Sequence, residues 1–454
     1  MTATLTPGLS QAAVHLLRPL DQPLDDDFDD LRWLDAAVGS ARVVAIGESA
    51  HFNAESYRLR DRIFRYLATH HGFTGYAMES GFVEGRHVDH WVQGRLAADQ
   101  IGEVLATGMT SLMGMASQFH DQLDWMRARN AAVGGWELSG RVAFYGIDPP
   151  GSNLSLLPGL DLVTSYLAEA DPGFSPDPGL RELAASFAAS SNFDAVRAIT
   201  AYDKLDHADA DRLTAGLVTL LARLCTQRPE YLKRTSAEAY ETAVHVMELT
   251  VAEDLATRDG RDGRAAGHGP TVNIRDLAQA RSVTRILDHE ERIVLAAHNS
   301  HVQRYPIEFT GVFGPVTSAG QLLSEQLGDD YVVISTTQGS GKTLSMGEAF
   351  YRGEFFSDLE APQQGTVDAL MAATSDQVFG VDLRRVGTGD RQKLASVDRQ
   401  RSGPFACPID VLAAGDVIIH LPRVTPITVD DAALAHAPTE VADLFHAWQS
   451  GTDS

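Results

Sequence analysis

Short apolar runs alternate with longer amphipathic segments over the first 150 residues of the chain. The run Arg42–Ile46 is rich in β-branched residues and breaks at Gly47, which is typical of a buried strand. Residues 53–73 then carry apolar side chains at a helical period, and a second strand follows in "FTGYAMES" (73–80). A third strand is predicted in "RVAFYGID" (141–148), where two prolines end it. This alternation predicts an α/β fold with a central, mostly parallel (mixed) sheet flanked by helices.

The strand signal is lost after residue 150 and returns after residue 270. Residues 151–257 carry helical patterns only, and the glycine-rich, charged stretch 258–270 predicts a mobile loop. Further strands are predicted at 292–298, 330–339, 376–383 and 415–422, with helices at 271–289 and 430–449. We therefore expect an α/β core of residues 1–150 and 271–454 and an inserted helical cap at 151–270. The cap should cover a cleft at the carboxyl ends of the strands.

Composition excludes several classes of partner. The 454 residues carry a formal net charge of −24, and no basic cluster stands out, which argues against nucleic-acid binding. No apolar window is long enough for a transmembrane helix, and the N-terminus lacks the pattern of a signal peptide. The two cysteines, Cys225 and Cys407, lie far apart in the sequence and fit a reducing cytoplasm. We expect a cytoplasmic protein that acts on a small molecule without a membrane; its oligomeric state is not indicated.

Four of the predicted strands end in titratable side chains. The first delivers Glu48 and His51, the second Glu79, the third Asp148, and the strand "RIVLAAHNSH" delivers His298 and His301. Ligands of open parallel sheets bind in the crevice outside the carboxyl ends of the strands. If these strands are neighbours, three carboxylates and three histidines meet in one crevice.

Such a cluster indicates acid–base chemistry, because a histidine titrates near neutral pH and a carboxylate can orient it. Histidines and carboxylates are also ligands of zinc or iron, so a metal site remains an alternative, as does a protein that only binds its ligand. A serine nucleophile fits poorly, because "GESAH" has His51 where the nucleophile elbow needs a glycine. "TTQGSGKT" fails the phosphate-loop pattern, because Thr336 stands where that pattern needs a glycine.

Several motifs, in order along most of the chain, resemble the erythromycin esterase family. The opening G-E-x-x-H motif is followed nine residues later by an arginine, here Glu48, His51 and Arg60. A glutamate ends the next strand (Glu79), a W-x-R-x-x-N segment contains Trp125, and a G-x-D strand ends in Asp148. An R-D helix and an A-H-N-x-H motif complete the pattern with Arg275, Asp276, His298, Asn299 and His301. The family's helix usually carries methionine and asparagine where Gln279 and Ser282 stand, so we expect the substrate-facing surface of this helix to differ.

The resemblance implies a hydrolase that opens a lactone or ester of a bulky natural product, such as a macrolide, with a histidine-activated water. It implies His51 as general base, oriented by Glu48 or Glu79, with Arg60, His298 and His301 assisting. It also suggests that Asp148, Asn299 and Trp125 contact the substrate. The family resemblance implies neither a metal nor a cofactor. A biosynthetic enzyme using the same groups for cyclisation, elimination or epoxide opening is the alternative.

Overall fold

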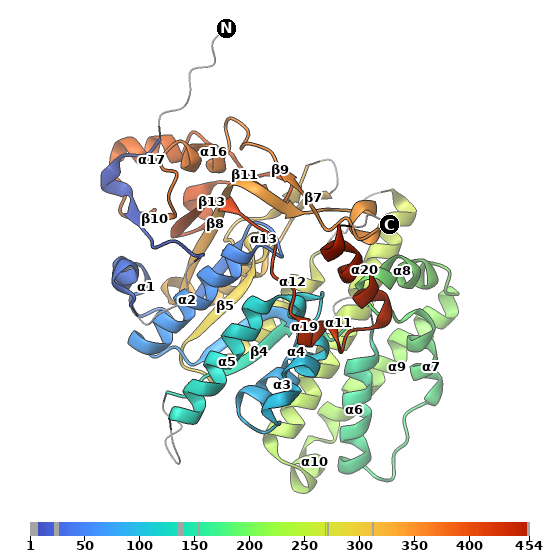
Figure 1. Ribbon diagram of the computed structural model, residues 1–454. Helices are drawn as coiled ribbons and strands as arrows, with labels where there is room; N and C mark the ends of the chain where they lie inside the picture. Colours follow the sequence, from blue (N-terminus) through green and yellow to red (C-terminus); the bar gives the residue numbers. More distant parts are fainter. Residues whose placement is uncertain are drawn as a thin grey trace.

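A nine-stranded mixed β-sheet forms the centre of the described part of the computed structural model, which covers residues 8–21, 27–133, 140–151, 155–267, 269, 272–310 and 313–451 (Figure 1). Its strand order is β1-β10-β13-β8-β2-β5-β3-β4, and β9 pairs with the end of β8. The six strands from β13 to β4 are parallel, whereas β1, β10 and β9 pair antiparallel. The predicted fold class is therefore confirmed. The strands are β1 (His15–Leu16), β2 (Val43–Glu48), β3 (Gly75–Gly81), β4 (Ala143–Asp148), β5 (Ile293–His298), β8 (Tyr331–Leu344), β9 (Phe356–Leu359), β10 (Phe379–Asp382) and β13 (Val417–Val424).

Helices cover both faces of this sheet because its buried strands are apolar on both sides. In β2, Val44 and Ile46 pack in the cluster that includes apolar residues of α2 (Ala54–His70) and α5 (Ser117–Ala132). The alternate residues Val43 and Ala45 pack in the cluster formed with α12 (Ile274–Ile286) and α14 (Ala319–Leu327). Helices α3 (Phe82–Val92) and α4 (Ile101–Gly108) extend the first layer. The shorter elements are α1 (Asp35–Val38), α13 (Asn299–Val302), α15 (Glu348–Tyr351), α16 (Val367–Ala372), α17 (Thr388–Leu394), α18 (Val411–Ala414) and α19 (Asp431–Leu434), with 3-10 helices at Gln11–Ala13, Asp29–Leu34, Ala98–Gln100, Met113–Met115, Asn192–Asp194 and Gly328–Asp330.

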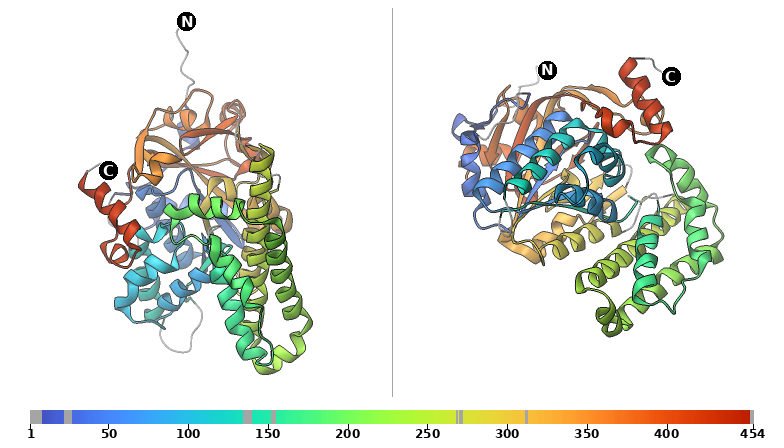
Figure 2. Two further views of the ribbon diagram at one scale, coloured as in Figure 1. Left: turned by 90° about the vertical axis from the view of Figure 1, so that its right-hand side faces the viewer. Right: turned by 60° about the horizontal axis from the view of Figure 1, so that its bottom comes forward.

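Residues 157–266 form a group of helices with an apolar core of its own, here called the helical subdomain. Its helices are α6 (Leu157–Ala170), α7 (Pro178–Phe187), α8 (Ala195–Asp203), α9 (His207–Thr226), α10 (Arg228–Arg234) and α11 (Ala237–Ala266). Leu160, Leu217 and Val246 lie at the centre of this core, and Phe82 and Ala278 connect it to α3 and α12. Figure 2 shows the subdomain beside the layered core. Within the described residues, every helix of the protein is too short or too polar to span a lipid bilayer.

The prediction of a mobile loop at 258–270 is wrong for most of that stretch, because α11 continues to Ala266. Its three arginines recur every third residue and face neighbouring helices of the subdomain. Arg258 and Arg264 form ion pairs of 2.6 Å with aspartates of α9 and α8, and Arg261 lies over the Tyr202 ring. These contacts offset the low helix propensity of the glycines. The helix ends at Gly267 in a left-handed conformation, and residues 268, 270 and 271 lie outside the described residues.

Two short hairpins near the sheet were not predicted from the sequence. One consists of β6 (Ile307–Phe309) and β7 (Phe313–Val316), and the other of β11 (Arg399–Ser402) and β12 (Phe405–Pro408). The tail, predicted as one helix, is split into α19 and α20 (Thr439–Ser450), with Pro438 directly before α20. Where the sequence resembles a phosphate loop, β8 continues to Leu344 as an uninterrupted strand.

Helix α3 lies so close to β4 that only glycine fits at their contact. A Cβ atom on Gly85 would lie 2.6 Å from the Gly146 backbone nitrogen. We expect Gly85→Ala to lower the free energy of unfolding by about 1–3 kcal/mol, because the helix must move off the strand. The urea-induced unfolding midpoint measures this.

Gly260→Ala on α11 is the matched control. Its Cβ would meet only the guanidinium end of the Arg264 side chain, at 3.2 Å. Alanine should there stabilise the helix by up to about 1 kcal/mol. Equal effects of the two substitutions would contradict the close contact.

Candidate active site

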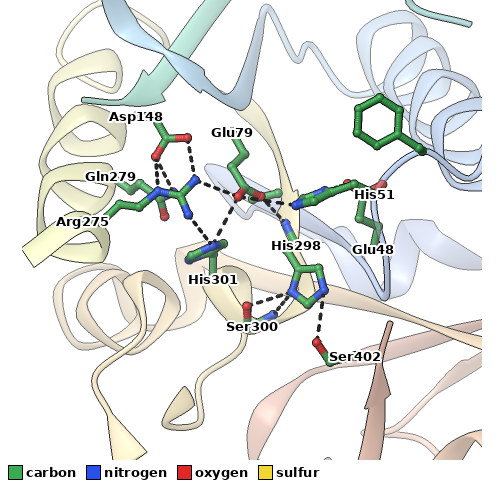
Figure 3. A network of polar contacts seen from close by, with 12 residues as sticks. Glu48, His51, Glu79, Asp148, Arg275, Gln279, His298, Ser300, His301 and Ser402 are labelled. Carbon is green, nitrogen blue, oxygen red and sulfur yellow. Dashed lines mark hydrogen bonds and ion pairs between the residues drawn. The ribbon is translucent and has the colours of Figure 1, made fainter. Parts of the chain in front are cut away.

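The titratable strand ends predicted from the sequence lie next to one another. Strands β2, β5, β3 and β4 are consecutive and parallel in the sheet, and Glu48 stands directly opposite His298 in the β2–β5 pairing. A cavity of about 310 Å³ opens at this edge, and His51, Glu79, His298 and His301 line it. Figure 3 shows these side chains pointing toward one another. The predicted crevice and the grouping of these residues therefore agree with the structure.

His51 lies in the turn between β2 and α2 and is held by Glu48. The His51 Nδ1 atom lies 2.6 Å from Glu48 Oε1, so Nδ1–H donates to the carboxylate. The other ring nitrogen, Nε2, faces Glu79 Oε1 at 3.9 Å. Burial disfavours the imidazolium, but the Glu79 charge and the hydrogen bond to Glu48 raise the pKa of His51 above 6.5. Phe52, the next residue, has φ = 62°, an unfavourable conformation for an aromatic residue that fixes the turn.

Arg60 lies behind this pair and does not line the cavity. Its guanidinium Nη1 is 3.1 Å from Glu48 Oε2, and the side chain is 2% exposed. The remaining nitrogens donate to the backbone carbonyls of Ile46 and Ala297, in β2 and β5. Arg60 thus fixes Glu48 against the sheet, and Glu48 fixes His51.

Glu79 is the residue that connects the two halves of the site. Its Oε2 accepts from the His298 backbone N–H at 2.7 Å, and its Oε1 accepts from Arg275 Nη2 at 2.9 Å. Although burial favours the neutral acid, the charges of His301, His51 and Arg275 hold the pKa of Glu79 well below its usual range. Glu79 is therefore a buried carboxylate anion.

Asp148 binds Arg275 rather than facing the cavity. The Arg275 guanidinium donates from Nε and Nη2 to the two oxygens of Asp148 at 2.8 and 2.9 Å, and Gln279 donates to Oδ1 at 2.9 Å. Burial disfavours the charged guanidinium, but the Asp148 and Glu79 carboxylates raise the pKa of Arg275. Gln279 and Ser282 were expected on a substrate-facing surface, but both are fully buried. Their side chains contact Asp148 and His245 instead.

His301, on α13, is held between two carboxylates. Its Nδ1 lies 2.7 Å from Asp276 Oδ1, and its Nε2 lies 3.3 Å from Glu79 Oε1. Burial opposes its charged form, but Asp276 and Glu79 raise the pKa of His301 to about 10. His301 is therefore a cation at neutral pH. Arg275 Nη1 lies 3.3 Å from the same Nε2, and the shared Glu79 anion offsets the repulsion of the two cations.

His298 has the opposite electrostatic character. Burial, with repulsion from His51, lowers the pKa of His298 to about 3, so the ring is neutral. Its Nδ1 accepts from the Ser300 backbone N–H at 3.2 Å, and its Nε2–H donates to the Ser49 carbonyl at 3.1 Å. Both nitrogens are thus used within the protein, and the ring lies 5.5 Å from that of His51, in an edge-on arrangement.

Two predicted substrate contacts are placed elsewhere. Trp125 packs against Phe64 on the outer helical layer, with Arg65 and Arg129 over its ring, and does not line the cavity. Its indole is needed to fill the space between α2 and α5. Asn299 is buried, and its amide binds both the N–H and the C=O of Thr336 in β8, at 3.1 and 2.8 Å.

The erythromycin esterase family profile matches residues 68–424. The chain belongs to the erythromycin esterase family. It is 28% identical over 371 residues to erythromycin esterase type II of Escherichia coli, and the aligned region covers 79% of this chain and 84% of that protein. The type I enzyme of Escherichia coli is 26% identical over 326 residues, 70% of this chain and 75% of that protein.

Two solved structures share the fold. One is a Bacillus cereus protein with a TM-score of 0.73 and 19% identity, covering 92% of this chain and 97% of that one. The other is a histidine-to-asparagine mutant of the erythromycin esterase EreC in its open conformation, with a TM-score of 0.73 and 22% identity, covering 91% and 98%. The profile of the erythromycin esterase family spans Glu79, Asp148, Arg275, His298 and His301, and begins after the segment that contains Glu48 and His51.

In this erythromycin esterase family member, the sequence motifs marked Arg275 and Asp276 but gave them no role. The structure places both on the first turn of α12, at the cavity. Asp276 also accepts from the Ala319 backbone N–H at 2.7 Å, which joins α12 to α14. In the sequence, the Arg-Asp pair at the start of the helix was the one sign of a role at the site. The helical pattern of apolar residues does not indicate which strand ends a helix faces.

The helical subdomain contributes no lining residue to this cavity within the described chain. The cavity walls come instead from α12, α13, the two hairpins and the end of β8. The position of the subdomain as a cap over the cleft stays a prediction. Among the described residues, no three histidine, cysteine, aspartate or glutamate side chains are arranged to hold a metal ion.

A substitution of Asn299 tests whether this residue stabilises the fold or contacts the substrate. We expect Asn299→Ala to lower the free energy of unfolding by about 1–3 kcal/mol, because two buried backbone groups of Thr336 lose their partner. The KM of the folded variant should stay within about twofold of the wild-type value. Urea unfolding and steady-state kinetics measure the two effects. A stable variant with a strongly raised KM would instead make Asn299 a substrate contact.

Proposed function

We propose that the protein hydrolyses the lactone ester of a macrolide-like natural product, with a water molecule activated by His51. Membership of the erythromycin esterase family supports hydrolysis of such an ester. The names of its relatives, erythromycin esterases of type II and type I, support a macrolide as the substrate class. The proposal requires neither metal nor cofactor.

The observation that carries the proposal is the orientation of His51. Donation of Nδ1–H to Glu48 leaves the Nε2 lone pair free to accept a proton at the cavity. The 3.9 Å between Nε2 and Glu79 Oε1 is a separation that one water can bridge with hydrogen bonds to both atoms. That water would be held by Glu79 and deprotonated by His51 as it attacks the ester carbonyl.

The charges of the site favour the protonated state that His51 reaches during the reaction. Four buried carboxylates belong to the connected network: Glu48, Glu79, Asp148 and Asp276. Three cations among the described residues oppose them: Arg60, Arg275 and His301. With neutral His51 these side chains carry one excess negative charge, which stabilises the imidazolium formed when His51 takes the proton from water. The negative charge left by that proton passes to the ester oxygen. In a buried site such compensation stabilises the transition state.

We propose that Arg275 donates to the developing oxyanion and that His301, whose ring nitrogens face Asp276 and Glu79, assists through its positive charge. Both line the cavity, and both are cationic at neutral pH. Arg275 Nη1 contacts no described carboxylate; it lies 3.3 Å from His301 Nε2, and the second N–H of Nη1 can donate to substrate. Neutral His298 then serves as a wall of the site and as an anchor for the Ser49 turn, rather than as a second base.

The general-base role predicts the effect of His51→Asn. We expect kcat for macrolide ester hydrolysis to fall by at least about 10²-fold while the folded structure is retained. Steady-state hydrolysis of erythromycin, followed by mass spectrometry, measures this. His120→Asn is a matched control, because His120 is also 27% exposed and also contacts a carboxylate, Asp430, at 2.6 Å, away from the cavity. Unchanged turnover in folded His51→Asn would refute the assignment.

The pH dependence gives a second test. Only neutral His51 can accept a proton, so kcat/KM should fall as pH drops through a pKa above 6.5. Glu48→Gln removes a charge and a hydrogen bond that raise this pKa, so the acidic limb should move to lower pH although kcat falls. The position of the limb does not depend on how much enzyme is folded. Glu290→Gln, whose carboxylate binds Thr74 and Tyr145, should leave the limb in place; a limb unmoved by Glu48→Gln would contradict the proposed pair.

A further inference from the structure

The cavity at the strand ends is lined by two chemically different sets of side chains. His51, Glu79, Arg275, His298 and His301 form the polar side described above. A second set is apolar, and we call it the apolar wall. It consists of Ile307, Phe309, Phe313, Leu344, Met346 and Phe405.

Three separate stretches of chain build the apolar wall. The two hairpins supply its aromatic residues, and the far end of β8 supplies Leu344, with Met346 just beyond. Phe309 lies where the two hairpins meet: its ring lies 5.2 Å from that of Phe313 in its own hairpin and 5.9 Å from that of Phe405 in the other. The contact with Phe405 is edge-to-face, a favourable arrangement for aromatic rings. The two hairpins thus form one continuous surface.

The rim of the wall exposes large apolar side chains to solvent. Phe405 is 42% exposed and Met346 is 56% exposed, although both line the cavity. Neither side chain is part of the packing between the sheet and its helices. Phe405 belongs to the β11–β12 hairpin, and Met346 follows the end of β8. Apolar surface gathered at a cavity beside a polar cluster is typical of a ligand site.

We infer that the apolar wall selects the substrate of this enzyme. It binds the broad aliphatic face of a large lactone ring and so places the ester against His51 and Glu79 on the polar side. A small ester can reach the polar side without touching the wall. The inference rests on the proposed hydrolysis and adds to it the residues that determine substrate size, with Phe309 and Phe405 at the centre.

Contacts between the apolar wall and a part of the substrate remote from the ester are the same in the ground state and in the transition state. Such uniform binding lowers KM and leaves kcat unchanged. Loss of one aromatic ring removes enough apolar contact to change kcat/KM by about 10-fold. The wall thus predicts a KM effect on bulky substrates only.

The test compares kcat/KM for erythromycin and for p-nitrophenyl acetate in the full-length enzyme. We expect Phe405→Ala and Phe309→Ala to lower kcat/KM for erythromycin by about 10-fold through KM, and to leave that for p-nitrophenyl acetate within about twofold. Phe405→Leu, which keeps an apolar side chain, should restore most of the loss. Tyr351→Ala is the control, because Tyr351 is 38% exposed but does not line the cavity. Equal losses for both esters, or no loss for erythromycin, would overturn the wall as the selecting surface.

A binding measurement tests the apolar wall independently of the proposed hydrolysis. In the His51→Asn background, equilibrium dialysis of erythromycin should give a dissociation constant that Phe405→Ala raises by about 10-fold. If the wild type hydrolyses no ester but this binding and its loss are observed, the proposed reaction fails and the wall stands. If erythromycin does not bind saturably, or binds Phe405→Ala equally well, the inference is overturned.

Discussion

The insertion of β5 between β2 and β3 is the constraint on which the site depends. Strands β2 and β3 follow one another in the sequence, yet each pairs with β5, which lies more than two hundred residues later. The parallel register places Glu48 opposite His298 and brings the His298 backbone N–H to Glu79 at 2.7 Å. A slip of the register by one residue would turn Glu48 and His298 to the other face of the sheet and so misplace the site.

Arginines at two positions offset part of the buried negative charge at this edge of the sheet. Arg60 reaches Glu48 and two strand carbonyls from α2, and Arg275 reaches Glu79 and Asp148 from α12. Each helix therefore contributes a planar donor that fixes carboxylates from the strands in one geometry. Buried carboxylates would otherwise be driven toward the neutral acid. The network lacks one positive charge, and the proposed role of His51 follows from that deficit.

The three histidines illustrate how environment separates identical side chains. His301 lies between Asp276 and Glu79 and is held as a cation, whereas His298, in contact with backbone and hydroxyl groups, is held neutral. Of the three, His51 has one ring nitrogen hydrogen-bonded to Glu48 and the other at the cavity, 3.9 Å from Glu79. The sequence showed three equivalent candidates at strand ends; hydrogen-bond partners contributed by α12, α13 and the Ser49 turn make them different.

The sequence by itself determined the α/β alternation, the strands that carry Glu48, Glu79, Asp148 and His298, and the family to which they belong. Those features are local, because runs of β-branched residues and helical patterns can be recognised within a short stretch of consecutive residues. Only the tertiary structure decided which side chains face the cavity. Trp125 and Asn299 fill and join elements of the core, and Arg275 enters the site from a helix. The strands of the two hairpins have three or four residues, which is too short to show an alternating pattern of apolar and polar residues. Helix α11 continues through its glycines because its arginines form ion pairs with other helices. Such partners are distant in sequence, so no local pattern could have indicated them.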